Sequence, residues 1–328
     1  MKTKFISTTL SLIFFKLSFC QITTTKVINK EVSQKVLVYD STKNFLSNDV
    51  FLYKGQELYL NEKSEGLRKY GYDGFMIDYK ESSASLKNTY KPIIPENQEY
   101  IKYDIGGGKS IYDSLAGKYF KVLDVYAHPK AKEQESYYGT KYYFALEEKG
   151  SGNKIFFEYD SKYESSFPFL VVGYFEKLKQ NFVGQSYVIC TKYFENEKDI
   201  ITGKVIHNRP GQKWTCIDLT IEEQYYTISL ILKNDLGEKV FADHEYLFEM
   251  GGKSQVFTWK KAETYKNKFG IVNWHIILNR EAKIGFTEEM VKLAMGEPES
   301  INKASYGNQW VYDGQYLYFE NGKLKAFN

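Results

Sequence analysis

Apolar and polar residues alternate along most of the chain up to about residue 265. Runs such as Tyr119–Tyr126 and Lys154–Tyr159 show the two-residue period of a half-buried β-strand, and Gly-rich turns separate such runs. The pattern therefore predicts a mainly β protein in which helices come late. The predicted strands are Lys35–Tyr39, Glu57–Leu60, Phe75–Tyr79, Tyr119–Tyr126, Lys141–Glu147, Lys154–Tyr159, Phe169–Phe175, Tyr187–Tyr193, Lys213–Ile221, Tyr225–Leu232 and Lys239–His244.

A short motif recurs four times, with a glycine, then Lys or Gln, then alternating apolar residues. It opens at Gly55, Gly117, Gly184 and Gly211. Glycine at the start of a strand is typical of a turn or bulge. The first three glycines recur at similar intervals, and each interval suits a small five-stranded β-barrel or sandwich of SH3-like size. The motif predicts tandem β units within residues 21–110, 111–177 and 178–265, with linkers near 80–110 and 250–270; chance recurrence is the alternative.

The carboxyl-terminal residues 266–328 follow a different pattern. Thr287 is a suitable N-cap with two acidic residues after it, and Gly296 and Pro298 end the predicted helix. Three strands come next, separated by Asp-Gly and Asn-Gly pairs that favour type I′ turns. These strands are Gln309–Tyr312, Tyr316–Phe319 and Lys323–Phe327. We predict an α+β module in which the helix covers one face of a three-stranded antiparallel meander.

This last region resembles the SmpA/OmlA (BamE-like) family. The residues that carry the resemblance are Ile284–Val291, Gly296–Pro298, Gln309–Tyr312 and Tyr318–Leu324. The resemblance covers about residues 280–328, and Phe286 stands where the family usually has Met. It implies an interaction or structural module, similar to the accessory lipoprotein of the outer-membrane β-barrel assembly machine, and no catalytic residues. The rest of the chain is similar only in style to Bacteroidetes-type exported proteins, with tandem SH3-like β units.

The first twenty residues are typical of a secretory signal peptide. Lys2 and Lys4 precede an apolar run, and Cys20 stands before a cleavage position at Gln21. The run is too short and interrupted for a transmembrane helix; a buried strand is the alternative. Lipidation of Cys20, for which Phe19 is unsuited, is the one route we consider to peripheral membrane attachment. We expect an exported protein that is periplasmic, associated with the outer membrane or extracellular.

Composition narrows the class of partner. The aromatic share is 17%, with 29 Tyr and 23 Phe, and these residues favour strands. Three of the 44 Lys and Arg residues lie in the first twenty positions, so the rest of the chain balances its 41 Asp and Glu residues. Composition therefore forces no basic face, and we expect no nucleic-acid partner.

The cysteines after the amino-terminal segment are Cys190 and Cys216, and each follows a Gly-Gln pair within six residues. Neighbouring strands could bring them together, and an oxidising compartment would permit a disulfide. Two buried free thiols are the alternative. Neither cysteine stands in the context of a known catalytic nucleophile.

We find no pattern that predicts catalysis, a metal site or a cofactor. The run 106–110 ends like a P-loop but lacks the first glycine of that motif. The four histidines do not stand at metal-ligand spacing, and no G-x-S-x-G sequence occurs. We therefore expect a protein without catalytic, cofactor-binding or metal-binding residues.

The aromatic residues supply two functional hypotheses. The expected function is protein interaction or scaffolding by a non-enzymatic envelope protein, whose partner is an envelope protein. The alternative is binding of cell-wall glycan or another polysaccharide by aromatic side chains of the SH3-like units. Candidates for such a surface are Trp214, Trp259, Trp310, Tyr312 and Tyr318. Packing inside a core competes with this role for each of them.

Overall fold

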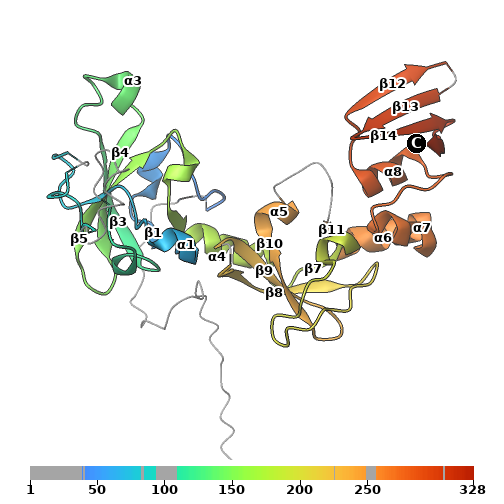
Figure 1. Ribbon diagram of the computed structural model, residues 1–328, viewed down its shortest axis with the longest axis horizontal. Coiled ribbons are helices and arrows are strands. Elements are labelled where there is room, and N and C mark those ends of the chain that lie inside the picture. The colour runs from blue at the N-terminus through green and yellow to red at the C-terminus, as the bar shows by residue number, and fades with distance from the viewer. Residues whose placement is uncertain are drawn as a thin grey trace, which may run out of the picture.

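The computed structural model describes residues 39, 41–82, 85–93, 109–224, 226–248, 256–305 and 307–328. Fifteen strands in these residues form three antiparallel sheets of six, five and four strands, none of them closed. The sheets follow one another in chain order (Figure 1), and each has its own hydrophobic core. The prediction of a mainly β protein is therefore confirmed. The predicted signal peptide with Cys20, the strand over residues 35–38 and the glycines at 106–108 lie outside the described residues.

The first sheet has the strand order β2-β5-β4-β3-β1-β6, and we call β1 to β6 the first unit. Its strands are β1 (Glu57–Leu60), β2 (Phe75–Met76), β3 (Tyr119–Ala127), β4 (Lys141–Glu148), β5 (Lys154–Asp160) and β6 (Phe169–Val171). Short helices lie before and between them: η1 (Val50–Tyr53), α1 (Glu65–Arg68), η2 (Tyr112–Ser114), α3 (Glu135–Tyr138) and η3 (Glu164–Ser166). Buried side chains such as Leu58, Phe144 and Phe157 fill the core.

The second sheet has the order β10-β9-β8-β7-β11, and we call β7 to β11 the second unit. Its strands are β7 (Ser186–Ile189), β8 (Trp214–Ile221), β9 (Ile228–Lys233), β10 (Lys239–Asp243) and β11 (Val256–Thr258). The helices around it are α4 (Val172–Phe182), η4 (Thr191–Phe194), α5 (His244–Phe248) and α6 (Trp259–Phe269). Sequence predicted strand through Phe175 and a linker near 250–270. Instead, α4 begins directly after β6 and α6 directly after β11.

The two units share one topology. Without β2, the order β5-β4-β3-β1-β6 of the first unit matches β10-β9-β8-β7-β11 of the second. Gly55 and Gly184 precede the first strands, Gly117 and Gly211 precede the second strands, and all four have positive φ. The four motifs therefore mark two units of the described chain rather than three. The predicted division at residue 110 falls inside the first sheet, because β1 pairs with β3.

Each unit is joined to the next part of the chain through the outer face of its sheet. In the first unit, Tyr59 of β1 and Leu170 of β6 pack into the core of the second unit. In the second unit, Val188 of β7 and Phe257 of β11 pack into the third core. The neighbouring residues along these strands face the core of their own unit, as alternation along a strand requires. Both junctions therefore use equivalent positions.

The third sheet has the order β12-β13-β14-β15 and follows two helices. The elements are α7 (Ile271–Leu278), α8 (Glu288–Met295), β12 (Ser300–Ala304), β13 (Gly307–Tyr312), β14 (Gln315–Glu320) and β15 (Lys323–Phe327). The Thr287 hydroxyl caps α8 by accepting from Met290 N at 3.3 Å. Strand β12 was not predicted. Asn321 and Gly322 both have positive φ, but of the pair Asp313 and Gly314 only the glycine does, so a type I′ turn there was a wrong prediction.

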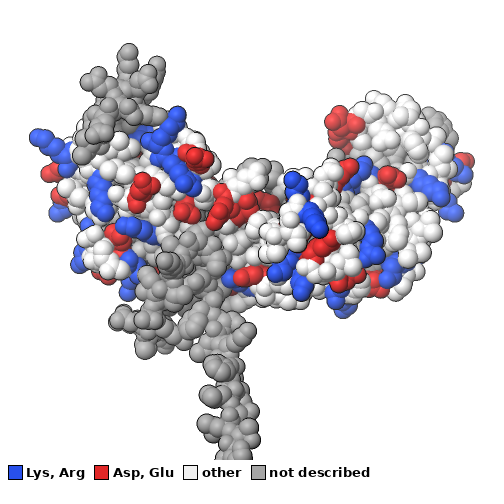
Figure 2. Space-filling model, turned by 60° about the horizontal axis from the view of Figure 1, so that its bottom comes forward, with Lys and Arg blue, Asp and Glu red and all other residues white. Residues whose placement is uncertain are grey.

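No helix of the described residues is both long and apolar enough to span a membrane. Figure 2 shows that Lys and Arg are interspersed with Asp and Glu over the face displayed, without a large region of one sign.

Candidate binding surface

Two stacked tyrosines lie beside an open hollow on the first unit. Tyr79 comes from the connection after β2, and Tyr126 lies near the end of β3. Their rings are 4.8 Å apart between centroids and inclined by only 4°. The hollow has a volume of about 610 Å³ and is lined by Tyr79, Lys80, Val125, Tyr126, Ala127 and Pro129. Apolar ring faces beside a shallow hollow suit contact with another molecule.

The outer face of the sheet positions these rings. Tyr126 pairs with Tyr143 across β3 and β4, so their side chains share one face. The Tyr79 ring lies 5.7 Å from that of Tyr143 and 5.1 Å from that of Phe156, between ring centroids. The connection between β2 and β3 therefore lays Tyr79 over the outer face of the sheet.

The β3–β4 loop extends the aromatic area. Tyr138 of α3 stacks on His128, with 3.9 Å between ring centroids, and the Lys141 ammonium lies 4.8 Å from the ring centroid of Tyr137. Tyr137 is 62% exposed, whereas Tyr79, Tyr126 and Tyr138 are half-buried. We call these four tyrosines (Tyr79, Tyr126, Tyr137 and Tyr138) the tyrosine surface.

Polar groups on the same sheet face stabilise the tyrosine surface. The Tyr143 hydroxyl donates to Glu158 Oε2 at 3.0 Å, and Lys141 Nζ lies 3.4 Å from Glu158 Oε1. Burial and the nearby Glu158 carboxylate raise the pKa of Tyr143, so its hydroxyl stays protonated. Burial lowers the pKa of His128, whose Nδ1 accepts from Lys130 N at 3.1 Å. At neutral pH the surface therefore presents neutral rings rather than an imidazolium.

The aromatic residues singled out from sequence do not form one surface. Trp214 lies in the second core, and Trp310 and Tyr312 lie in the third, each at most 7% exposed. A ring enclosed in this way cannot stack on a glycan. Trp259 is half-buried at the start of α6, where the ammonium of Lys213 lies 5.3 Å from its ring centroid.

Tyr318 is the remaining candidate, and it is 38% exposed on the third sheet. It belongs to a polar row across three strands. Asn302 donates to Gln309 at 2.9 Å, and Gln309 donates to the Tyr318 hydroxyl at 3.1 Å. Tyr318 therefore lies on a hydrogen-bonded sheet face, away from the buried rings of Trp310 and Tyr312.

Cys190 and Cys216 form no disulfide with each other and lie in separate cores, Cys190 in the third and Cys216 in the second. Register explains why they do not meet. Cys216 N donates to Gln185 O, five residues before Cys190, which corresponds to a separation of roughly 16 Å along a strand. A disulfide needs Cα atoms within about 7 Å. Burial raises the pKa of both thiols, that of Cys216 to about 12.

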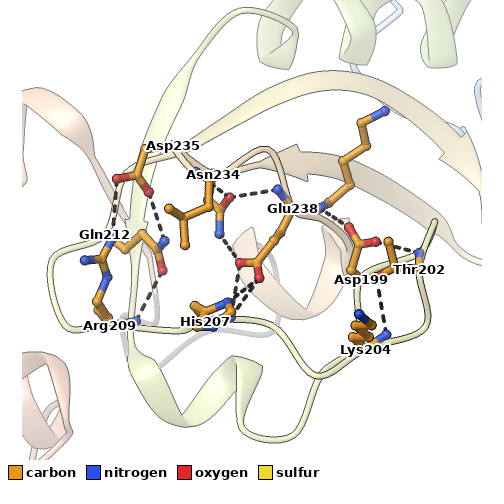
Figure 3. A network of polar contacts seen from close by, with 11 residues as sticks. Asp199, Thr202, Lys204, His207, Arg209, Gln212, Asn234, Asp235 and Glu238 are labelled. Atoms are coloured by element: carbon orange, nitrogen blue, oxygen red, sulfur yellow. Dashed lines mark hydrogen bonds and ion pairs between the residues drawn. The ribbon is translucent and has the colours of Figure 1, made fainter.

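A polar network holds the long connection between β7 and β8 against the β9–β10 turn (Figure 3). Asp199 accepts backbone N–H groups from Lys239 at 2.7 Å, Thr202 at 2.6 Å and Ile201 at 3.2 Å. These hydrogen bonds lower the pKa of Asp199 to about 2. The Asp199 carboxylate thus stabilises its own loop and connects that loop to β10.

The same network continues around Glu238 and Gln212. Glu238 accepts from the His207 backbone N–H and from Asn234 Nδ2, and it lies 2.6 Å from His207 Nδ1. Burial works to raise the pKa of Glu238, but these hydrogen bonds outweigh it and hold the pKa below its usual range. Gln212 donates to Asp235 at 3.0 Å. Because these side chains form hydrogen bonds with one another and with the backbone, we interpret the network as a structural support of the β7–β8 connection.

Within the described residues, no group of three or more His, Cys, Asp or Glu side chains could hold a metal ion.

The tyrosine surface was not singled out from sequence, because its residues lie in two separate segments. One available signal was the adjacent Tyr137 and Tyr138, two large aromatic residues in a polar loop that ends at Gly139.

No known family model matches the chain, and no curated protein or solved structure matches it either. Its function must therefore be argued from its own residues and their geometry.

Proposed function

We propose that this protein is a non-enzymatic exported envelope protein that binds a protein partner and acts as an interaction or scaffolding module. The observation that carries the proposal is the tyrosine surface, which exposes rings at one end of the first unit. Tyrosine gives a large contact area with few rotatable bonds and a polar tip, which is why it is enriched at interfaces. The partner is an envelope protein, and nucleic acid has no part in this function.

The arrangement of the chain supports a scaffolding role. Two units with one topology are joined through equivalent outer-face positions, and a third sheet continues the series. We propose that both units are SH3-like, since their fifth strand returns beside their first. We also propose that residues 280–328, with α8 and the sheet that follows it, form an SmpA/OmlA-like module. Such a series would hold several surfaces at set distances.

Site-specific crosslinking in cells tests this function. A photo-reactive amino acid replaces Tyr126, and a matched control carries it at Tyr316, which is 41% exposed on the third sheet. We expect a crosslinked envelope protein that mass spectrometry identifies reproducibly at position 126 and not at position 316. Absence of any protein crosslink at position 126, in a variant that folds like the natural protein, would contradict the proposal.

The second candidate function is recognition of a polysaccharide. The specific observation is the hollow beside Tyr126, whose lining includes ring and aliphatic surface together with Lys80. Purified cell wall would be incubated with the natural protein and with Tyr126→Ala, using Tyr316→Ala as the control. Retention that Tyr126→Ala alone abolishes would favour glycan binding; equal retention of all three proteins would exclude it from this surface.

A further inference from the structure

The β8–β9 hairpin end of the second unit is a docking surface within this chain. Its residue Tyr226 packs against the second core, and Arg68 Nη2 of α1 in the first unit donates to the Tyr226 hydroxyl at 2.8 Å. The Arg68 guanidinium also lies 5.4 Å from the ring centroid of Tyr112. Tyr226, at the end of this hairpin, therefore binds the second unit to the first.

The β3–β4 hairpin end of the first unit is its equivalent. His128 N donates to Lys141 O at 3.0 Å where β3 and β4 part, as Glu222 N donates to Thr227 O at 2.9 Å where β8 and β9 part. Here the hairpin end carries Tyr137 and Tyr138 and points away from the second unit (Figure 1). The hairpin end that docks in the second unit thus carries an exposed aromatic side chain, Tyr137, in the first unit.

Charges of both signs surround these rings. Lys130, Lys132, Glu133 and Glu135 are all exposed in the β3–β4 loop. None of the four has an ion-pair partner among the described residues. A surface with both signs is complementary to itself when a two-fold axis passes between its lysines and its glutamates, because the axis then places the lysines of one copy opposite the glutamates of the other.

We propose that the tyrosine surface and the β3–β4 loop dock onto the same surface of a second copy of this chain. The tyrosines form the apolar centre of the isologous contact, and the two lysines face the two glutamates across the axis at its rim. This inference deepens the proposed protein-binding function by naming the partner, and it rests on that function.

Charge reversal gives a test in which the protein serves as its own control. One variant carries Lys130→Glu and Lys132→Glu, and another carries Glu133→Lys and Glu135→Lys. Each variant alone opposes like charges across the axis, whereas an equimolar mixture restores opposite charges. A matched control carries Lys303→Glu and Lys323→Glu on the third sheet, where both lysines are exposed. Sedimentation equilibrium from about 1 μM to about 1 mM measures association.

The natural protein and the control are expected to dimerise alike. Each β3–β4 variant alone is expected to weaken the dimer by roughly tenfold, and their mixture to recover it. Added salt should weaken the natural dimer, and Tyr137→Ser should weaken it without changing the salt dependence. A natural protein that stays monomeric, or variants that associate like it, would overturn the second-copy proposal.

Crosslinking at Tyr126 distinguishes failure of the second-copy proposal from failure of the proposed protein-binding function. A monomeric protein that crosslinks to a different envelope protein would leave the proposed function intact and overturn this inference. If no protein crosslinks there, both are overturned. A crosslink between two copies at Tyr126 is the result expected here.

Discussion

Asp124 and Asp218 occupy the same position in the two units. Each follows a β-bulge, at Val122/Asp124 in β3 and at Cys216/Asp218 in β8. Each side chain accepts the backbone N–H of the next residue, at 2.9 Å and 2.8 Å, and binds a lysine from the segment before the first strand. Lys54 Nζ lies 2.9 Å from Asp124, and Lys179 Nζ lies 2.7 Å from Asp218. In each unit, the aspartate after the bulge thus binds the segment that precedes the first strand to the sheet.

Unequal burial of the two lysines predicts unequal stability effects. The Lys179 side chain is 11% exposed and that of Lys54 is 47% exposed. We expect Asp218→Ala to lower the free energy of unfolding by about 2 kcal/mol, since it takes the carboxylate from a mostly buried ammonium. Asp124→Ala should cost less than about 1 kcal/mol. Urea unfolding measures both, and equal losses would contradict the expectation.

The outer-face junction predicts that Leu170 behaves as a core residue. It is 3% exposed because it packs into the core of the next unit. Leu170→Ala should lower the free energy of unfolding by about 3 kcal/mol through the cavity it leaves. Leu236, which is 55% exposed in a turn, is the control, and Leu236→Ala should change stability by less than about 0.5 kcal/mol. A similar small effect for both would mean that the junction is not packed.

Gly71 is a position where the backbone excludes a side chain. It has positive φ, and a Cβ there would overlap the carbonyl oxygen of Ser110, which accepts from Tyr72 N. Gly71→Ala should cost about 2 kcal/mol or more. Gly66 in α1 has open space around it, so Gly66→Ala should be neutral or stabilising by up to about 1 kcal/mol. Thermal unfolding of the two variants compares them directly.

Thiol chemistry should reflect the separate cores of Cys190 and Cys216. Burial raises the pKa of both thiols, so neither is a thiolate at neutral pH, and the thiolate is the reactive form. Both should resist alkylation in the folded protein and react in denaturant without a reductant. Peptide mass spectrometry detects the labels. A crosslinked peptide that contains both cysteines would contradict this structure.

Acid should release the β7–β8 connection by protonating Asp199. Its pKa of about 2 in the folded protein lies below the usual value of about 3.9, so the stabilisation is complete above pH 4 and is lost as the pH falls through 2. The Thr202 amide, which donates to Asp199, should shift in NMR spectra over that range. In Asp199→Asn the shift should disappear; an unchanged titration would assign it to another group.

Strand positions were largely predictable from sequence. Glu57–Leu60 was predicted and observed with the same bounds, and Lys154–Tyr159 differs from β5 by one residue. Alternation and turn chemistry are local, so they can be read without knowing what each strand contacts. The run after Val171 was misjudged because its apolar and aromatic residues suit a strand as well as a helix. Phe175 and Leu178, at helical spacing, are buried in the second core, and that burial decides for α4.

The candidate site was much less predictable. Trp214 and Trp310 were reasonable binding candidates by residue type, yet both lie in cores. Sequence does not predict Tyr79 and Tyr126 as candidates, since their stacking depends on a connection that returns to the outer face of the sheet. The exposure of a ring depends on all the residues that pack around it, so it cannot be inferred from the residue type at one position.

Local features of this protein follow from its sequence alone: a β-rich chain, strands opened by Gly55, Gly117, Gly184 and Gly211, and a Thr287-capped helix near the end. Three features depend on the folded chain: the four glycines mark two units, Cys190 and Cys216 lie in different cores, and Tyr79 stacks on Tyr126. Turns and caps depend on neighbouring residues, whereas strand pairing and burial depend on segments brought together from distant parts of the chain.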